Sequence, residues 1–113
     1  MITKAGQQPV ELKPQMRGGD GTAHLTHVLK GALPENMRLF SVIRLEPGCS
    51  IGYHVHENET ELFYFISGQG QVQDDDIFVE VQAGDAMATP SGHGHGVKNT
   101  GHQDLVIMAA IAK

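Results

Sequence analysis

Short runs of apolar and alternating residues recur along the chain, and their pattern predicts strands. Ile77, Val79 and Val81 alternate with Phe78 and Glu80, which is the period-two pattern of a half-buried strand. Four further apolar or β-branched runs predict strands at 22–29, 39–45, 62–66 and 105–111. The last two of these runs are apolar on both parities, as expected of strands that are covered on both faces.

Turn residues separate these runs and indicate the class of fold. Glycine recurs at the corners, and the pair Pro47-Gly48 closes the run at 39–45. The only helical candidate is a single turn at 33–37. Many short strands joined at glycine corners predict an all-β sandwich or barrel.

The length and composition fit one domain. The chain has 113 residues, of which 40% are hydrophobic and 19% charged, values that are typical of a globular protein. Residues 1–20 contain Pro9 and Pro14, and we expect them to form an N-terminal arm. Residues 21–113 are then expected to form a single barrel domain.

Charge and cysteine content argue against several partners and locations. The net charge is −5 and Lys and Arg form no cluster, which argues against nucleic acid or an anionic membrane as partner. The longest apolar run, 105–112, is far shorter than the ~20 residues of a membrane helix. Cys49 is the only cysteine, and residues 1–13 lack the apolar stretch of a signal peptide. We therefore expect a cytoplasmic protein.

Histidine is unusually frequent, and it gathers in two places. Seven histidines stand against four phenylalanines, two tyrosines and no tryptophan. In the segment YHVHENETE, residues 53–61, His54 and His56 would point to one face of a strand, with Glu61 beyond a short polar loop. A second cluster lies in PSGHGHGVKN, residues 90–99. Histidine is the commonest metal ligand among side chains, so these clusters raise the question of a metal site.

Taken together, the two clusters read Gly48-x5-His54-x-His56-x4-Glu61-x6-Gly68 and Gly84-x5-Pro90-x-Gly92-x2-His95-x3-Asn99. This pattern resembles the two-part signature of the cupin superfamily at every defining position. The separation between the halves, residues 69–83, is similar to that of small single-domain cupins of type 2. The resemblance implies a cupin jelly-roll β-barrel made of two packed antiparallel sheets. The segments RGGDGTAHLTHVL and GCSIGYHVHE are also similar to single cupins described as oxalate-decarboxylase-like.

The same resemblance implies a set of metal ligands. His54, His56, Glu61 and His95 would bind one divalent transition-metal ion inside the barrel, and no further cofactor is expected. Three imidazoles and one carboxylate leave two positions of an octahedral ion for ligand or water. Mn²⁺, Fe²⁺, Co²⁺, Ni²⁺ and Zn²⁺ all suit these ligands, and the sequence does not choose among them.

Aromatic and histidine neighbours of these positions are further candidates. Phe63 and Phe65 share the parity of Glu61 and are predicted to line the substrate pocket, whereas Tyr64 should face outward. His93 would share the face of His95 in an extended segment. It is the candidate catalytic residue, as an acid–base group or an anion contact at the rim, and an exposed turn histidine is the alternative.

Charged residues near the mouth are harder to place from the pattern. Arg17, Arg38 and Arg44 are the arginines available to a carboxylate, and nothing in their spacing places them in the cavity. Glu57 and Glu59 precede Glu61 and either guard the mouth or belong to a solvated loop.

Three functions are consistent with these residues. The first is a metal-dependent enzyme that acts on a small carboxylate or dicarbonyl compound, through lyase or oxygenase chemistry. The second is a sugar isomerase or epimerase, and the third is a protein that binds or senses a small molecule without turnover. A general base with a perturbed pKa inside the cavity would favour an enzyme. We also expect a homodimer, because a lone two-sheet domain could not cover both faces of its apolar strands.

Overall fold

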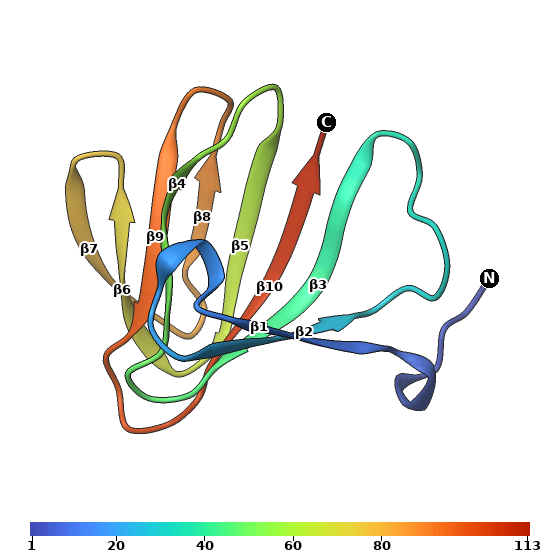
Figure 1. Ribbon diagram of the computed structural model, residues 1–113, viewed down its shortest axis with the longest axis horizontal. Helices are drawn as coiled ribbons and strands as arrows, with labels where there is room; N and C mark the ends of the chain where they lie inside the picture. The colour runs from blue at the N-terminus through green and yellow to red at the C-terminus, as the bar shows by residue number, and fades with distance from the viewer.

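Ten strands form two antiparallel sheets that face one another across an apolar core in the structure, a computed structural model of residues 1–113 (Figure 1). The strands are β1 Val10–Pro14, β2 Thr22–His27, β3 Met37–Leu45, β4 Ser50–Val55, β5 Thr60–Ser67, β6 Gln69–Asp74, β7 Ile77–Gln82, β8 Ala86–Thr89, β9 Gly94–Asn99 and β10 Leu105–Ala112. The larger sheet has the order β1-β2-β3-β10-β5-β8, and the smaller has the order β4-β9-β6-β7. The predicted all-β fold of two packed antiparallel sheets is confirmed.

The strands that are apolar on both parities occupy the middle of the larger sheet. β10 pairs with β3 on one side and with β5 on the other. Phe63 and Phe65 of β5 point into the core, whereas Leu62 and Tyr64 on the opposite face are about half exposed. Alternate residues of β5 and β10 therefore build the core, and the residues between them form an apolar outer face of the larger sheet.

Two expectations about secondary structure are wrong. No helix forms at 33–37, because a single backbone hydrogen bond from the Met37 N–H to the Pro34 carbonyl closes a turn and Met37 already begins β3. β7 is not a half-buried strand, since Ile77 and Val79 are exposed and only Val81 is buried. β7 is the edge of the smaller sheet, and its first residues extend beyond the core.

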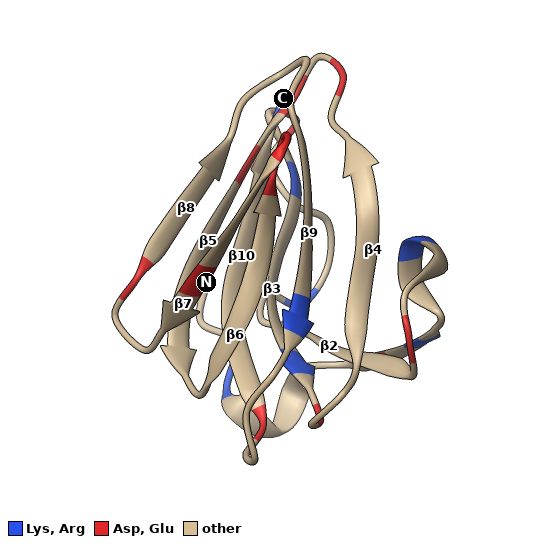
Figure 2. Ribbon diagram, turned by 90° about the vertical axis from the view of Figure 1, so that its left-hand side faces the viewer, with Lys and Arg blue, Asp and Glu red and all other residues tan.

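The first 20 residues contain regular structure of their own. β1 pairs antiparallel with β2 and becomes the outermost strand of the larger sheet. Two short 3₁₀ helices, η1 Ala5–Gln7 and η2 Met16–Gly18, lie on either side of β1. Neither helix has the length or apolar character needed to cross a membrane. Lys and Arg are scattered over separate elements rather than gathered on one face (Figure 2).

Asn99, at the end of β9, joins the two sheets at one end of the barrel. Its side chain is fully buried, and its amide group donates hydrogen bonds to the carbonyls of Leu45 and Gln103, each at 2.8 Å. Its side-chain oxygen accepts the N–H of Gly101 at 2.9 Å. Leu45 is the last residue of β3, so this amide ties the smaller sheet to the larger one.

Replacing Asn99 should therefore destabilise the barrel. Asn99→Ala leaves buried backbone groups without partners, and we expect a loss of about 2–4 kcal/mol in the free energy of unfolding. Asn99→Asp keeps the size but cannot donate to either carbonyl, so it should be no better tolerated. Urea unfolding followed by circular dichroism measures both, and a wild-type midpoint for Asn99→Asp would contradict this role of the amide.

Candidate metal centre

Four side chains that can ligate a metal meet between the two sheets. His54 lies on β4 directly opposite His95 on β9, and His56 follows β4 by one residue. Glu61 reaches the same point from β5 in the other sheet. One ligand atom from each of the four residues lies within 4.8 Å of every other, so the group is positioned to hold a metal ion. His56, Glu61 and His95 are buried, and His54 is half-buried.

The innermost atoms of this cluster are in close contact. The Nε2 atoms of His56 and His95 are 3.1 Å apart. Glu61 Oε1 lies 3.0 Å from the first and 2.9 Å from the second. The three imidazole rings also meet edge to face, with centroids 4.8 to 4.9 Å apart.

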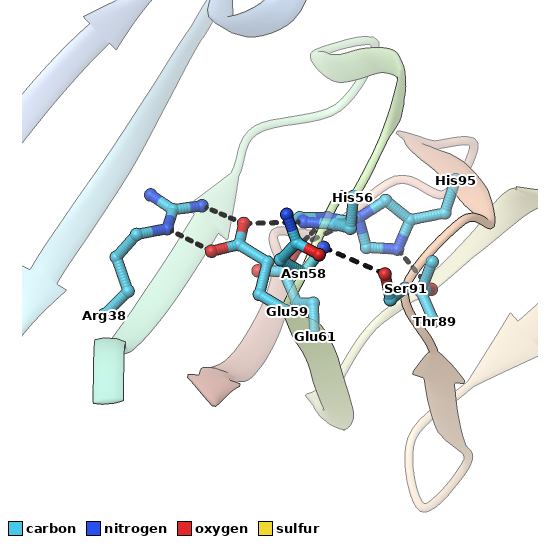
Figure 3. Close-up of polar contacts among 8 residues, drawn as sticks. All are labelled: Arg38, His56, Asn58, Glu59, Glu61, Thr89, Ser91 and His95. Carbon is cyan, nitrogen blue, oxygen red and sulfur yellow. Dashed lines mark hydrogen bonds and ion pairs between the residues drawn. The ribbon is translucent and has the colours of Figure 1, made fainter. Parts of the chain in front are cut away.

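The outer nitrogen of each ring has its own partner. His54 Nδ1 donates to the carbonyl of Gly52 at 2.8 Å, and His56 Nδ1 donates to the carboxylate of Glu59 at 3.1 Å. His95 Nδ1 lies 2.8 Å from the hydroxyl of buried Thr89, which can accept its proton (Figure 3).

These outer contacts determine what the rings present to the centre. A neutral imidazole that donates from Nδ1 carries a lone pair on Nε2. With all three Nδ1 protons donated outward in this way, three nitrogen lone pairs and a carboxylate oxygen converge with no proton donor among them, an arrangement that a cation would stabilise. The donor set therefore fits a metal ion on the evidence of its own hydrogen bonds.

Glu59, which the sequence places either at the mouth or in a solvated loop, contacts one of the predicted ligands. Its carboxylate accepts two hydrogen bonds from Arg38, both at 2.7 Å, and a third from His56 (Figure 3). The paired guanidinium is the main reason why the pKa of Glu59 falls to about 2. Glu59 is therefore ionised and holds His56 in place, rather than belonging to a solvated loop. The polar run that contains it carries no periodicity from which this contact could be read.

Burial and charge keep His54 neutral. Desolvation is the largest cause that lowers the pKa of this imidazole, and positive charge on His95, Arg17 and His56 lowers it further. The hydrogen bond to Gly52 opposes these effects only in part. His54 is therefore in the uncharged form that a metal requires at neutral pH.

The segments that carry the two histidine clusters are hydrogen-bonded to each other. The N–H of His56 donates to the carbonyl of His93 at 3.0 Å, and the N–H of Gly92 donates back to the carbonyl of His56 at 2.7 Å. The N–H of Asn58 donates to the hydroxyl of Ser91 at 2.8 Å (Figure 3). These bonds bring the β4–β5 and β8–β9 loops together and so set the distance between His56 and His95.

A cavity of about 460 Å³ opens onto the cluster. His54, His56 and Glu61 lie on its surface. Its walls include aliphatic side chains from four adjacent strands of the larger sheet, namely Leu12 of β1, Leu25 of β2, Leu39 of β3 and Ile111 of β10. A second cavity, of about 470 Å³, lies beside Gln69 and His102 and includes none of the four cluster residues.

Three cationic side chains line the cavity at the cluster, and the sequence pattern placed none of them there. They are Lys13, Arg17 and Arg38. Arg38 is engaged by Glu59, whereas Arg17 has no ion-pair partner. Arg44 is elsewhere and pairs with Asp104 at 3.1 Å.

The other candidates lie outside this cavity. The His93 side chain is half exposed and pairs with Asp75 at 2.5 Å, and this hydrogen bond raises the pKa of the imidazole. Phe63 lies behind the cluster, stacked on the His95 ring with centroids 4.9 Å apart. Phe65 is wholly buried in the core, edge to face with Phe63. Neither phenylalanine is among the residues that line the cavity.

Comparisons with known proteins agree with this geometry. The cupin domain family matches residues 41–111 of the chain. A protein of Thermotoga maritima named as an oxalate-binding protein is 38% identical over 112 residues, which is 98% of this chain and 93% of the relative.

Solved structures give the same result. The crystal structure of a predicted oxalate decarboxylase from Thermotoga maritima has a TM-score of 0.92 and 37% identity, and the match covers 99% of this chain and 98% of that one. A cupin 2 conserved barrel domain protein from Salinispora arenicola has a TM-score of 0.70 at 21% identity, over 91% of this chain and 82% of that one, and shows the fold alone. The chain therefore belongs to the cupin family.

Proposed function

We propose that this protein binds one divalent transition-metal ion through His54, His56, Glu61 and His95. The observation that carries this proposal is the placement of a hydrogen-bond partner at the outer nitrogen of each imidazole. Each Nδ1 has an acceptor outside the cluster, so the Nε2 lone pairs and the carboxylate converge beneath an open cavity. Imidazole and carboxylate together suit Mn²⁺, Fe²⁺, Co²⁺, Ni²⁺ or Zn²⁺.

The ligand proposed for this centre is a small carboxylate that chelates through two oxygens, such as oxalate, an α-keto acid or an α-hydroxy acid. When bound, the metal would supply two open positions and polarise the ligand. Cationic side chains on the cavity surface suit an anion. The name of the 38% identical relative, an oxalate-binding protein, supports the same class of ligand.

The groups around the cavity favour binding over turnover. A decarboxylation needs a proton for the product carbon, and is served best by an acid near the open positions whose pKa is close to the working pH. The carboxylate of Glu59, which contacts His56, is ionised and accepts bonds from Arg38 and His56. The remaining polar side chains on the cavity surface are the cations described above and Gln15. Reversible carboxylate binding is accordingly the function that the site supports best.

Turnover of the bound carboxylate is the second candidate. It is favoured by the 37% identity to a crystal structure described as a predicted oxalate decarboxylase. Conversion of oxalate would consume one proton and release carbon dioxide and formate. Formate accumulation in proportion to the amount of metal-loaded protein would identify this activity.

Removal of one ligand should remove the metal. His56→Ala deletes a buried nitrogen of the cluster, and we expect the metal content to fall from about one ion per chain to near zero. His102→Ala is the matched control, because this histidine is exposed and lies by the other cavity. Elemental analysis of protein purified without a histidine tag measures both, and equal metal in wild type and His56→Ala would refute the ligand set.

Oxalate should stabilise the metal-loaded protein. A ligand that binds only the folded state contributes about 2.7 kcal/mol at a hundredfold excess over Kd, which for this size raises the melting temperature by about 10 °C. Acetate, which offers a single carboxylate, should give a much smaller shift. The oxalate shift should vanish in folded His54→Ala protein that lacks metal. If a neutral sugar raises the melting temperature and no dicarboxylate, keto acid or hydroxy acid does, the proposed carboxylate ligand is wrong. A sugar isomerase or epimerase then becomes the better proposal.

We further propose that the protein is a homodimer formed through the outer face of the larger sheet. Leu62, Tyr64 and Ile66 of β5 are 49%, 51% and 45% exposed and form an apolar row on this face. Val106, Met108 and Ala110 of the neighbouring strand β10 continue the row and are partly buried. A two-fold partner would cover these residues, and a stable interface would bury more than ~1,000 Å² in total.

A charge on this face should separate the subunits. Tyr64→Lys places an ammonium group in the middle of the proposed interface, and we expect a monomer by light scattering at micromolar concentration. Phe78→Lys is the matched control, because Phe78 is 64% exposed on the smaller sheet. A wild-type monomer, or a dimer lost only in Phe78→Lys, would contradict the proposed face.

A further inference from the structure

The turn between β1 and β2 has an unusual backbone. Gln15 (φ 51°, ψ 46°) and Arg17 (φ 55°, ψ 29°) both adopt the left-handed conformation, which residues with a side chain rarely adopt. A hydrogen bond from the Gln15 N–H to the Gly21 carbonyl, at 2.7 Å, closes the turn. Such a conformation persists only where the surroundings hold it.

Strand β4 provides those surroundings. The Ser50 N–H donates to the Asp20 carbonyl at 2.8 Å, and the Asp20 N–H donates to the Ser50 hydroxyl at 2.8 Å. The turn and the strand also approach through two glycines. A Cβ atom on Gly19 would lie 2.2 Å from the Ser50 carbonyl oxygen, and one on Gly52 would lie 2.1 Å from the Arg17 carbonyl oxygen. Side chains at these two positions would push the turn away from β4.

This close approach positions Arg17 on the cavity surface together with His54. Gly52 serves both residues, since its carbonyl accepts the His54 Nδ1 proton and its missing side chain admits the Arg17 backbone. Arg38 and Arg44 are each held by a carboxylate, which leaves Arg17 as the arginine free to receive a ligand. A guanidinium can bind a carboxylate through two parallel hydrogen bonds.

We propose that Arg17 determines the preference of this site for anions, and that Gly19 and Gly52 keep it there by letting the strained turn lie against β4. The proposal rests on the proposed function, because Arg17 would contact the part of the carboxylate ligand that the metal does not hold. It assigns two tasks to different parts of the chain. The histidines and Glu61 hold the metal, and the turn from Gln15 to Gly21 selects the charge of the ligand.

The test separates metal binding from ligand binding. Metal content and oxalate affinity, the latter by titration calorimetry, are measured on Arg17→Gln, Gly19→Ala and the double variant. Arg17→Gln should keep the metal and weaken oxalate binding roughly tenfold to hundredfold, the range for loss of a hydrogen bond to a charged group. Gly19→Ala should weaken it comparably with Arg17 still present, because φ at Gly19 is −75° and only the steric contact with Ser50 changes.

The double variant distinguishes positioning from general damage. If Gly19→Ala acts by displacing Arg17, the double variant should bind oxalate no more weakly than Arg17→Gln alone. Arg44→Gln and Gly6→Ala are the controls and should bind oxalate as the wild type does. Arg44 pairs with Asp104 outside the cavity, and a Cβ on Gly6 would meet nothing within 4 Å.

Each outcome has a defined meaning. Wild-type oxalate affinity in metal-loaded Arg17→Gln overturns the inference and leaves the proposed function intact. Fully additive losses in the double variant overturn the positioning role of Gly19. A metal-loaded wild type that does not bind oxalate refutes the carboxylate ligand, and the role of Arg17 with it. If Gly19→Ala fails to fold, Arg17→Gln still decides, because its exposed side chain is not needed for packing.

Discussion

The structure depends on one electrostatic constraint, which is the meeting of four potential acceptor groups, three of them buried, at a single point between two sheets. Two ring nitrogens at 3.1 Å and a carboxylate oxygen about as close to each would repel one another without a positive charge among them. A buried group of this kind is stable only if something supplies that charge. The apolar stacking of Phe63 on His95 strengthens the constraint, because it keeps water from the inner side of the ring.

The surrounding residues are arranged to keep those acceptors directed inward. A carbonyl, an ionised carboxylate and a hydroxyl take the outer positions at His54, His56 and His95. Arg38 supports the orientation of His56 indirectly. Its ion pair keeps Glu59 ionised, and the ionised carboxylate accepts the hydrogen bond from His56 Nδ1. The polar loops next to the cluster would thus act on a bound metal through the orientation of the imidazoles, as is usual for residues around metal sites.

The predictable part of this site is the part that follows from period and spacing. His54 and His56 are two apart on a strand and so share a face, and the glycine corners indicate an all-β fold. The cupin jelly roll and the full set of four ligands were implied by the resemblance of the two histidine segments to the cupin signature. The positions of Glu59 and Arg17 could not be predicted from the sequence, because each lies in an irregular segment whose conformation is set by contacts distant in sequence. The exposure of β7 was missed for a related reason, since alternation of apolar residues does not reveal that a strand is at the edge of its sheet.

The turn before β2 illustrates how such irregular segments carry specificity. A left-handed residue other than glycine costs about 1–2 kcal/mol, and this turn contains two. Glycine at position 17 would remove that cost, yet the position holds the longest cationic side chain, on the surface of the cavity. Conformational strain at Gln15 and Arg17 is thus combined with two glycines, Gly19 and Gly52, that let the turn lie against β4. A barrel of regular strands can hold a metal with little strain, and two of the four left-handed residues other than glycine lie in the turn that we propose to meet the ligand.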